Sequence, residues 1–356
     1  MKFIDKVKFW IKEIYINLEI KFGTKKTQTK DEEFFYVFLD LLSFRCTWDI
    51  VGFLILAKIN SGDKKVKIVV LPEINLRFDN SPPKEKSWLK NSSKKIRFDN
   101  IIKPCFEIVE NLNPIIILLN DRKDANDYIN NAKYKFPEYS KPNKVIEWDY
   151  EIYKKINNNF NLFKTTPSLK APIQYESIVD EYIKENSKGK KIVTITLRDS
   201  SFNESKNSNL KEWLKVYEKL NKDGFCVIFL DDFENVSINC HKSELIKKNI
   251  YHYANIDLRV RLALYERAFV NLTVSNGTAQ LLNYSKYTSF LMFKHYIDDV
   301  TSSTSLENNL KINGLDGKKN EQYPFHNKCQ KIVWDPIDSY ETIINEFEKI
   351  KTDLVN

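Results

Sequence analysis

The chain has 356 residues, of which 42% are hydrophobic and 29% charged, a composition typical of a folded protein long enough for two domains. Its net charge of +8 comes from 56 basic and 48 acidic residues that are interspersed along the chain. The long single-sign block of many nucleic-acid-binding proteins is missing, so no nucleic-acid partner is expected. A moderate basic excess instead favours anionic ligands such as nucleotides, or an anionic membrane surface.

Cysteine and histidine spacing argues against disulfide and zinc chemistry. The 5 cysteines are scattered and never form a CxxC pair, which indicates reduced thiols in a reducing compartment. The 4 histidines show no metal-ligand spacing such as HExxH. A zinc enzyme is therefore not expected.

The apolar runs are too short for a membrane span. The longest, Phe34–Phe44 and Ile50–Ile59, are each interrupted by a charged residue and fall well below the roughly 20 residues that a spanning helix needs. The first residues contain an acid and no small-residue cleavage site, unlike a secretory signal. A cytoplasmic location is expected.

Residues 1–22 are predicted to form a separate amphipathic helix. Lysines occupy several of its positions, and its apolar residues share one helical face: Phe3, Val7, Trp10, Ile11, Ile14 and Leu18. One interpretation is a helix that lies on anionic lipid, which would make the protein peripheral on the inner face of the membrane. The other is a helix packed on its own domain.

Residues 23–165 are predicted to form a first α/β domain. It opens with a βαβ unit made of strand Phe34–Leu42, helix Ile50–Ile59 and strand Val66–Leu71. Thr47 or Asp49 is expected to cap the helix, in a loop on the side where ligands bind. The remaining predictions are a surface loop or flap over residues 79–100, a helix over Ile101–Asn111, a strand over Pro114–Leu119, irregular chain over Asp121–Pro142, a helix over Ile146–Phe160, and a boundary at Thr165–Pro172.

Residues 166–335 are predicted to form a second α/β domain, followed by a last helix within residues 336–356. Strands and helices alternate more clearly here, and Gly224 is expected to end one helix. The predicted strands are Ile192–Leu197, Phe225–Leu230, Ile250–Tyr253, Phe269–Val274, Ser289–Phe293 and Lys331–Trp334. The predicted helices are Ile173–Asn186, one capped by Ser208, one capped by Asp257, a short one from Ala279, and one from Asp338 or Ser339 to Ile350.

Polar residues follow the predicted strands of this second domain. In an open α/β sheet the carboxyl ends of the strands form one edge, where ligands bind. The residues placed there are Arg198, Asp199, Ser200, Asp231, Asp232, Tyr253, Asn255, Ser275, Asn276, Gly277 and Thr278. Arg198 can pair with a phosphate in bidentate fashion, and Asp199 can orient it; alternatively both form a solvated turn. Asp231 and Asp232 either accept ribose hydroxyls or solvate a loop.

The turn from Ser275 to Thr278 fits a phosphate or diphosphate. Gly277 allows a close backbone approach, the following helix offers unpaired N–H groups, and two hydroxyls add donors. Simple helix capping by Ser275 or Thr278 is an equal alternative. Neither a Walker A lysine pattern nor GxGxxG occurs, which argues against a P-loop enzyme and a classical dehydrogenase.

Residues 190–295 contain a recognisable series of motifs. They are Leu197-Arg198-Asp199-Ser200, Lys206-Asn207-Ser208 before a long helix, Gly224-Phe225, and the stretch from Asp257 through Phe269 to Ser275-Asn276-Gly277. In this order the motifs resemble those of bacterial surface-carbohydrate glycosyltransferases of the GT-B type. Lys206 stands where arginine is usual, and Asn276 separates Ser275 from Gly277. The first half matches only by its layout.

The resemblance implies two Rossmann-like domains facing across a cleft, with the acceptor on the first domain and a nucleotide-sugar donor on the second. It implies a transferase that needs no metal and no cofactor, with the nucleotide sugar as substrate. Arg198 and the turn at Ser275–Thr278 would hold the diphosphate, and Asp199, Ser200 and Asn207 would also bind the donor. It places Tyr253 and Asn255 near the base, and Asp231 near the ribose or sugar. Asp49 is the candidate general base, and the last helix returns to the first domain.

The expected function is transfer of a sugar from a nucleotide donor to a glycan or lipid-linked glycan of the cell surface, such as lipopolysaccharide or capsule. One alternative is a binding or scaffold protein that kept this fold without catalysis. Another is a different α/β enzyme that acts on phosphorylated sugars.

Overall fold

The computed structural model describes most of the chain, namely residues 31–44, 46–72, 94–149, 151–200, 204–231, 249–297, 305–315 and 320–355. The predicted N-terminal helix, Asp232 and most of the predicted flap lie outside these residues.

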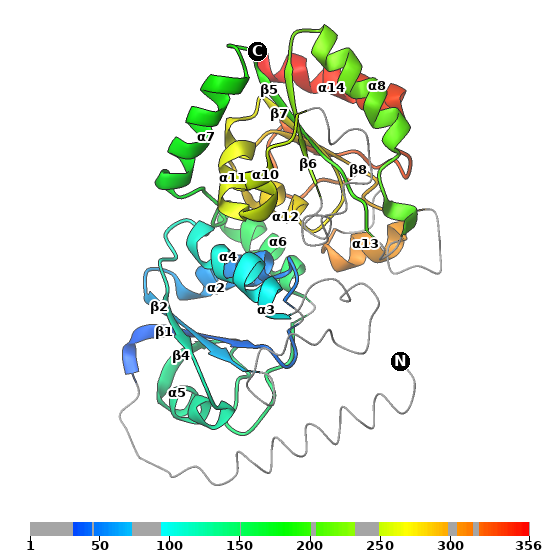
Figure 1. The fold of residues 1–356 in the computed structure, drawn as a ribbon. Helices are drawn as coiled ribbons and strands as arrows, with labels where there is room; N and C mark the ends of the chain where they lie inside the picture. Colours follow the sequence, from blue (N-terminus) through cyan, green and yellow to red (C-terminus); the bar gives the residue numbers. More distant parts are fainter. Residues whose placement is uncertain are drawn as a thin grey trace.

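The first half of the chain builds a sheet of four parallel strands in the order β3-β2-β1-β4 (Figure 1). The central strand β1 is buried from Phe35 to Asp40, as expected for a parallel strand covered on both faces. The strands are β1 (Asp31–Asp40), β2 (Lys65–Leu71), β3 (Ile115–Leu118) and β4 (Ala132–Phe136).

The helices of this half are α2 (Ile50–Ser61), α3 (Lys94–Arg97), η3 (Phe98–Ile102), α4 (Lys103–Ile108), η4 (Arg122–Asp124), α5 (Ala125–Asn131) and α6 (Ile152–Phe163). The prediction of irregular chain over Asp121–Pro142 is wrong, because α5 and β4 lie there. Helix α5 is short and rich in asparagine, so its periodicity is weak. Strand β4 is defined by its pairing with β1, which the local sequence does not reveal.

The second half builds a sheet of five parallel strands in the order β6-β5-β7-β8-β9. Every residue of β5, β6, β7 and β8 is buried, which explains why their sequences are apolar or β-branched at every position except Asn271. The strands are β5 (Ile192–Thr196), β6 (Cys226–Leu230), β7 (Val270–Val274), β8 (Phe290–Phe293) and β9 (Gln330–Ile332).

The helices of the second half are α7 (Ile173–Asn186), η5 (Glu204–Lys206), α8 (Leu210–Lys222), α10 (His252–Ile256), α11 (Leu258–Arg267), α12 (Ala279–Tyr284), α13 (Leu306–Ile312) and α14 (Tyr340–Val355). Asp257 caps α11 as predicted, by accepting from the main-chain N–H of Arg259. Ser208 does not cap α8: the cap residue is Asn209, whose N–H donates to Asp338 Oδ2 at 2.8 Å.

The predicted strand over Ile250–Tyr253 is also wrong. Only Ile250 pairs with the sheet, through a single parallel bridge to Phe229, and α10 begins at His252. Aromatic and β-branched residues suit a strand. Here the ring of Tyr251 instead stacks on Tyr182 of α7, with centroids 3.7 Å apart and an interplanar angle of 9°. This tertiary contact explains why the propensity of the segment is overridden.

The last helix does not return to the first half. Ile343, Phe347 and Ile350 of α14 pack into the same apolar cluster as Trp213 of α8 and the strands of the second sheet. Figure 1 places α14 beside α8, on the far side of that sheet from the first half. The helix therefore completes the layer that covers the second sheet.

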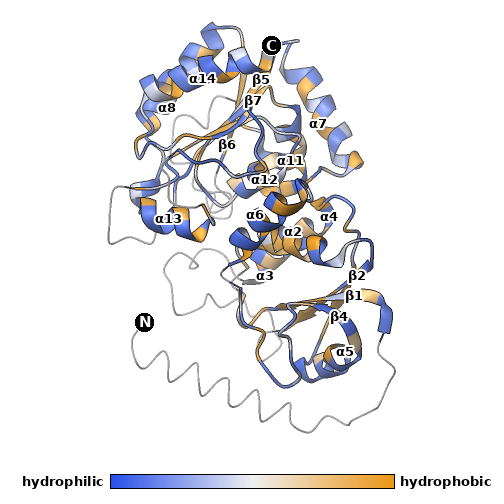
Figure 2. Cartoon of the chain, turned by 180° about the vertical axis from the view of Figure 1, so that it is seen from behind, coloured by the Kyte–Doolittle hydropathy of each residue, from blue (hydrophilic) through white to orange (hydrophobic). Residues whose placement is uncertain are grey.

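One apolar core joins the two halves. It runs from β1 through α2, α4 and α6 to α7, α11 and α12, and reaches Met292 of the second sheet. Helix α2 lies at its centre: its residues are buried from Ile50 to Ala57, and it is apolar all round (Figure 2). Separate clusters cover the outer face of each sheet. Helices thus cover both faces of both sheets, as in other doubly wound α/β folds.

Within the described residues, the chain contains no helix that is both long enough and apolar enough to span a membrane.

Candidate functional site

Each sheet has one position where the connections leave in opposite directions. In the second sheet the chain passes from β5 to β6 on one side and to β7 on the other. In the first sheet it passes from β1 to β2 on one side, and β4 lies on the other. Ligands of open α/β sheets bind outside the carboxyl ends of the strands at such switch points. The loops after β1, β5 and β7 are therefore the places to examine.

The loop after β5 is closed by hydrogen bonds between its two ends. The main-chain N–H of Arg198 donates to Ser208 Oγ at 2.8 Å, and Ser208 N–H donates to the carbonyl of Arg198 at 2.9 Å. The Asn207 side chain both accepts from and donates to the main chain of Ser200. Asn207, predicted as a donor-binding residue, therefore fixes the loop, while Arg198 is half-buried and Asp199 is exposed at its start.

Lys206 in this loop is a buried cation. Its Nζ donates to the carbonyl of His295 at 3.2 Å, and among the described residues it forms no ion pair with a carboxylate. Burial first, and then the neighbouring charges of Arg198 and Lys294, lower the pKa of Lys206 to about 8. A desolvated cation beside two others favours an anion at this place.

Lys294 follows β8 and completes a basic cluster, defined here as Arg198, Lys206 and Lys294. Its Nζ donates to the carbonyl of Asn207 at 2.6 Å and lies 3.5 Å from Asp338 Oδ1. Its backbone has φ of 50°, in the left-handed region that non-glycine residues seldom adopt. This residue therefore ties the end of β8 to the loop that carries Lys206.

The structure brings Asp231 and Asn255 together beyond the end of β6. The N–H of Asp231 donates to Asn255 Oδ1 at 3.0 Å, and the buried guanidinium of Arg261 donates to Asn255 Oδ1 and to the carbonyl of Asp231. Because Asn255 Oδ1 accepts these bonds, its amide Nδ2 faces away from them, and it has no partner among the described residues. Tyr253 lies on α10 with 42% of its surface exposed, and not at a strand end as predicted.

The turn after β7 is stabilised from within. Asn276 Oδ1 accepts from Thr278 Oγ1 at 2.8 Å and from the N–H of Ala279 at 3.0 Å. Thr278 occupies the N-cap position of α12, one of the two residues that the capping alternative named, but its side chain makes no capping bond; the Asn276 side chain accepts from the helix instead. The Thr278 hydroxyl is used inside the turn, and α12 is only six residues long. Both facts weaken the prediction of a diphosphate held by this turn alone.

Gly277 in the same turn touches the first half of the chain. A Cβ atom at this position would lie 1.9 Å from Cδ1 of Trp48, so any other residue would displace the Trp48 ring. Trp48 belongs to the loop after β1, directly before Asp49. The loops at the two switch points are thus in contact, and Asp49 lies next to that contact.

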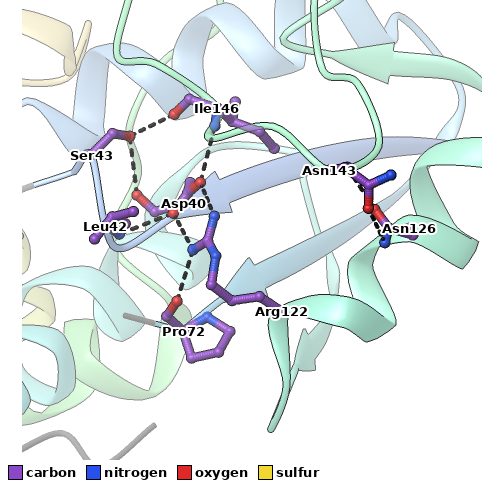
Figure 3. A network of polar contacts seen from close by, with 8 residues as sticks. All are labelled: Asp40, Leu42, Ser43, Pro72, Arg122, Asn126, Asn143 and Ile146. Carbon is purple, nitrogen blue, oxygen red and sulfur yellow. Dashed lines mark hydrogen bonds and ion pairs between the residues drawn. The ribbon is translucent and has the colours of Figure 1, made fainter. Parts of the chain in front are cut away.

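The start of the loop after β1 is anchored by a buried ion pair (Figure 3). Arg122 forms two bonds of 2.6 Å to the carboxylate of Asp40, and its Nη1 also donates to the carbonyl of Pro72. Asp40 further accepts from the N–H groups of Leu42 and Ile146. The ends of β1 and β2 are therefore held by a charge pair whose partners neutralise each other.

Asp49 accepts a hydrogen bond at each carboxylate oxygen. Thr47 Oγ1 donates to Oδ2 at 2.7 Å, and the hydroxyl of Tyr153 donates to Oδ1 at 2.9 Å. Asp49 precedes α2 without capping it by its side chain. Burial and the Asp49 carboxylate raise the pKa of Tyr153 well above its usual value, so this hydroxyl remains a donor. The carboxylate is held in one orientation.

Among the described residues, no group of three or more histidine, cysteine, aspartate or glutamate side chains is arranged to hold a metal ion.

Sequence reasoning missed several of these residues. Lys294 belongs to no sequence motif. A lysine after an apolar strand is common on protein surfaces, so the local sequence does not mark it as a site residue. Trp48 and Tyr153 acquire their places through contacts across the chain. In the sequence, Lys206 stands out only as a lysine at a position where arginine is usual. One signal was available, since the predicted strand over Ser289–Phe293 ends directly before Lys294.

No protein-family model matches the chain, and no curated protein matches it significantly. Solved structures do. The E. coli ADP-heptose LPS heptosyltransferase II is 8% identical, with a TM-score of 0.52, and the match covers 91% of this chain and 100% of that one. At 8% sequence identity, this match is evidence for a shared fold only. The fold is of the GT-B type.

Two further neighbours align at lower TM-scores. A family 9 glycosyl transferase from Veillonella parvula is 11% identical over 92% of this chain and 99% of its own, with a TM-score of 0.48. TibC of enterotoxigenic E. coli, a dodecameric iron-containing heptosyltransferase solved with ADP-D-beta-D-heptose, is 10% identical over 94% of this chain and 81% of its own, with a TM-score of 0.44.

Proposed function

We propose that this protein transfers a sugar from a nucleotide-activated donor to a glycan or lipid-linked glycan acceptor of the cell surface. The observation that carries the proposal is the contact of Trp48 with Gly277. This contact brings the loop after β1, which carries the Asp49 carboxylate, to the edge of the second sheet where the basic cluster lies.

The basic cluster is the proposed diphosphate site. A departing nucleoside diphosphate gains negative charge, and preorganised cations stabilise that charge in the transition state. Arg198 supplies a planar fork for two phosphate oxygens, and Lys206 supplies a buried point charge. Asp231 and Asn255 are proposed to bind the ribose and base, and Tyr253 to flank the base. Ser200, Asp199 and the turn from Ser275 to Gly277 are proposed to line the remainder.

Asp49 is the proposed general base. A base must accept the proton of the attacking acceptor hydroxyl as the bond to the anomeric carbon forms. Fixed bonds from Thr47 and Tyr153 orient the carboxylate without supplying a positive charge to neutralise it. The reaction is proposed to need no metal, and full activity in the presence of EDTA is the expected result.

The likeness to the E. coli heptosyltransferase suggests where to start a donor search. That protein is described as an ADP-heptose LPS heptosyltransferase. A glycan acceptor attached to lipid is proposed to bring this protein to the inner face of the membrane.

Nucleotide binding tests the proposal directly. We expect one of ADP, GDP, UDP or CMP to bind the protein in calorimetry, followed by the corresponding nucleotide sugar, with ADP-heptose tried first. The Arg198→Ala variant should bind at least about tenfold more weakly and lose transfer, because a charged hydrogen-bond pair is removed.

The matched control is Arg267→Ala, since Arg267 pairs with Glu176 and Asp180 of α7 and not with the basic cluster. It should bind the nucleotide as the wild type does. Absence of binding by every nucleotide would favour the scaffold alternative. Full transfer by a folded Arg198→Ala variant would remove this residue from the mechanism.

A further inference from the structure

Helix α6 lies between the two halves and presents one face to the second. Its residues Tyr153, Asn157 and Phe160 are spaced by four and three positions, so they form one stripe. Tyr153 stacks on Tyr284 of α12 with ring centroids 6.5 Å apart, and Phe160 meets Phe325 edge-on at 6.1 Å. All of these partners belong to the second half.

Asn157 supplies the polar contact of this stripe. It is 3% exposed, and its Nδ2 donates to the carbonyls of Asn313 and Gly314 at 2.9 and 3.1 Å. Main-chain carbonyls are fixed acceptors, so these bonds define how far along α6 the second half is seated. These two hydrogen bonds therefore fix the position of α6 relative to the second half, which apolar burial alone would not do.

Gly314 allows this close approach for two independent reasons. Its φ is +65°, a conformation that favours glycine. A Cβ atom at the same position would lie 2.6 Å from the Cα of Lys154, which is also on α6. Both the backbone conformation and the available space therefore require a glycine where α6 meets the second half.

The same helix also holds the proposed base. The hydroxyl of Tyr153, one turn before Asn157, donates to Asp49 Oδ1. The ring of Tyr153 lies against Gly52 of α2, where an added Cβ would be 3.0 Å from Cε1. Asp49 directly precedes α2. A shift of α6 would therefore move both the donor to the carboxylate and the helix that follows it.

On the opposite side, Asn313 leads to the basic cluster. Its Oδ1 accepts from the hydroxyl of Tyr323 at 2.5 Å, and its Nδ2 lies 3.4 Å from Nε2 of His295. The carbonyl of His295 is the acceptor for Lys206 Nζ. A line of adjacent polar groups thus connects the proposed diphosphate site to α6 and, through Tyr153, to Asp49.

We propose that Tyr153 is a positioning residue for Asp49. In this proposal α6, which Asn157 holds through the carbonyls of Asn313 and Gly314, fixes the distance between the base and the donor site of the other half. This inference rests on the proposed function. Tyr153 touches neither substrate; it acts by fixing the carboxylate that takes the proton. Its removal should affect the transfer step and leave nucleotide binding unchanged.

The test uses Tyr153→Phe, which keeps the stacked ring and deletes only the hydroxyl. Nucleoside diphosphate release is measured with the donor found in the binding screen, with water as acceptor. We expect kcat to fall about tenfold, while donor KM and nucleotide Kd stay at wild-type values. Tyr139→Phe is the control, because the Tyr139 hydroxyl donates to the main-chain carbonyl of Glu147.

A double-mutant cycle separates positioning from a structural role. If Tyr153 acts through Asp49, adding Tyr153→Phe to Asp49→Asn should lower the rate no further. A structural role would give the same loss in both backgrounds. Wild-type kcat in Tyr153→Phe, or additive losses in the cycle, would overturn this inference and leave the proposed function standing. Failure of every nucleotide to bind would overturn the proposed function, and this inference with it.

Discussion

The carboxyl edges of the two sheets treat buried charge in opposite ways. At the first edge, the Asp40 carboxylate and the Arg122 guanidinium form two bonds and neutralise each other (Figure 3). At the second edge, Lys206 is buried beside Arg198 and Lys294 without a carboxylate of its own among the described residues. Both edges are similar in topology, since each lies at a switch point of a parallel sheet.

The difference indicates what each edge is for. A buried pair that satisfies itself holds the chain and leaves nothing for a ligand to neutralise. A buried cation without a counter-charge lowers stability until an anion binds. The first edge therefore fixes the loop that carries Asp49, and the second edge is the one we propose as the site of the donor diphosphate.

Breaking the pair at the first edge should give the largest effect. Asp40→Ala leaves the Arg122 guanidinium buried without its counter-charge, and we expect the free energy of unfolding to fall by about 3–5 kcal/mol. Urea denaturation measures this. The control is Glu33→Ala, whose pair with Lys65 is 62% and 72% exposed and should contribute less than about 1 kcal/mol. A similar small loss for Asp40→Ala would contradict a structural role.

The contact between the two edges should be the next most sensitive point. Gly277→Ala places a Cβ atom 1.9 Å from Cδ1 of Trp48, so the Trp48 ring and the loop that carries it must move away. Because displacement of about 1 Å can slow catalysis about 100-fold, we expect a loss of that order in transfer rate. Trp48→Ala in the same chain should restore the room and part of the rate. Wild-type transfer by Gly277→Ala alone would show that the contact is dispensable.

Removing the Lys206 cation at the second edge should not lower the free energy of unfolding, in contrast to Asp40→Ala at the first edge. The lowered pKa of Lys206, about 8 against an ordinary 10.5, means that the unfolded chain holds this proton more tightly. Folding stability therefore rises as pH increases from about 8 toward 10.5, and Lys206→Met should be at least as stable as wild type at pH 7. Its nucleotide affinity should nevertheless fall about 10- to 100-fold.

The same group gives nucleotide binding a pH dependence. In wild type, affinity should decline as pH rises through about 8, because the free protein loses the charge that the diphosphate needs. Lys206→Arg should bind without this decline, since arginine stays charged. Calorimetry at pH 7 and pH 9 measures both. A decline of equal size in Lys206→Arg would assign the titration to another group.

Glu266 provides a milder case: it is a partly buried carboxylate that forms no ion pair with any described residue. Its carboxylate accepts from the N–H of Ala171, in the segment between the two halves, and burial raises its pKa to about 7. The folded chain thus holds the proton more tightly than the unfolded one. Stability from this group is complete below about 4.5 and is lost as pH rises through about 7. Glu266→Gln should flatten the pH dependence of Tm across this range; an unchanged profile would contradict the assignment.

The elements with strong periodicity were predictable. The run Ile192–Leu197, the helix that Asp257 caps and the strand before Ser275 all form close to their predicted bounds. Their residues are buried on both faces, so local composition and final environment agree. Where they disagree the prediction fails: Ala132–Phe136 is a strand because it pairs with β1, and Tyr253 is helical because its neighbour Tyr251 stacks on α7.

By itself, the sequence determined the α/β alternation, the polar edge after the second set of strands, and the position of Asp49 at the start of a helix, because each depends on residues adjacent along the chain. Only the tertiary structure decided three further features: Lys206 is buried with no acid paired to it in the described part of the chain, Trp48 contacts Gly277, and α6 connects Asp49 to the other half. Burial, charge compensation and contact between loops arise from residues distant in sequence, and no local pattern contains that information.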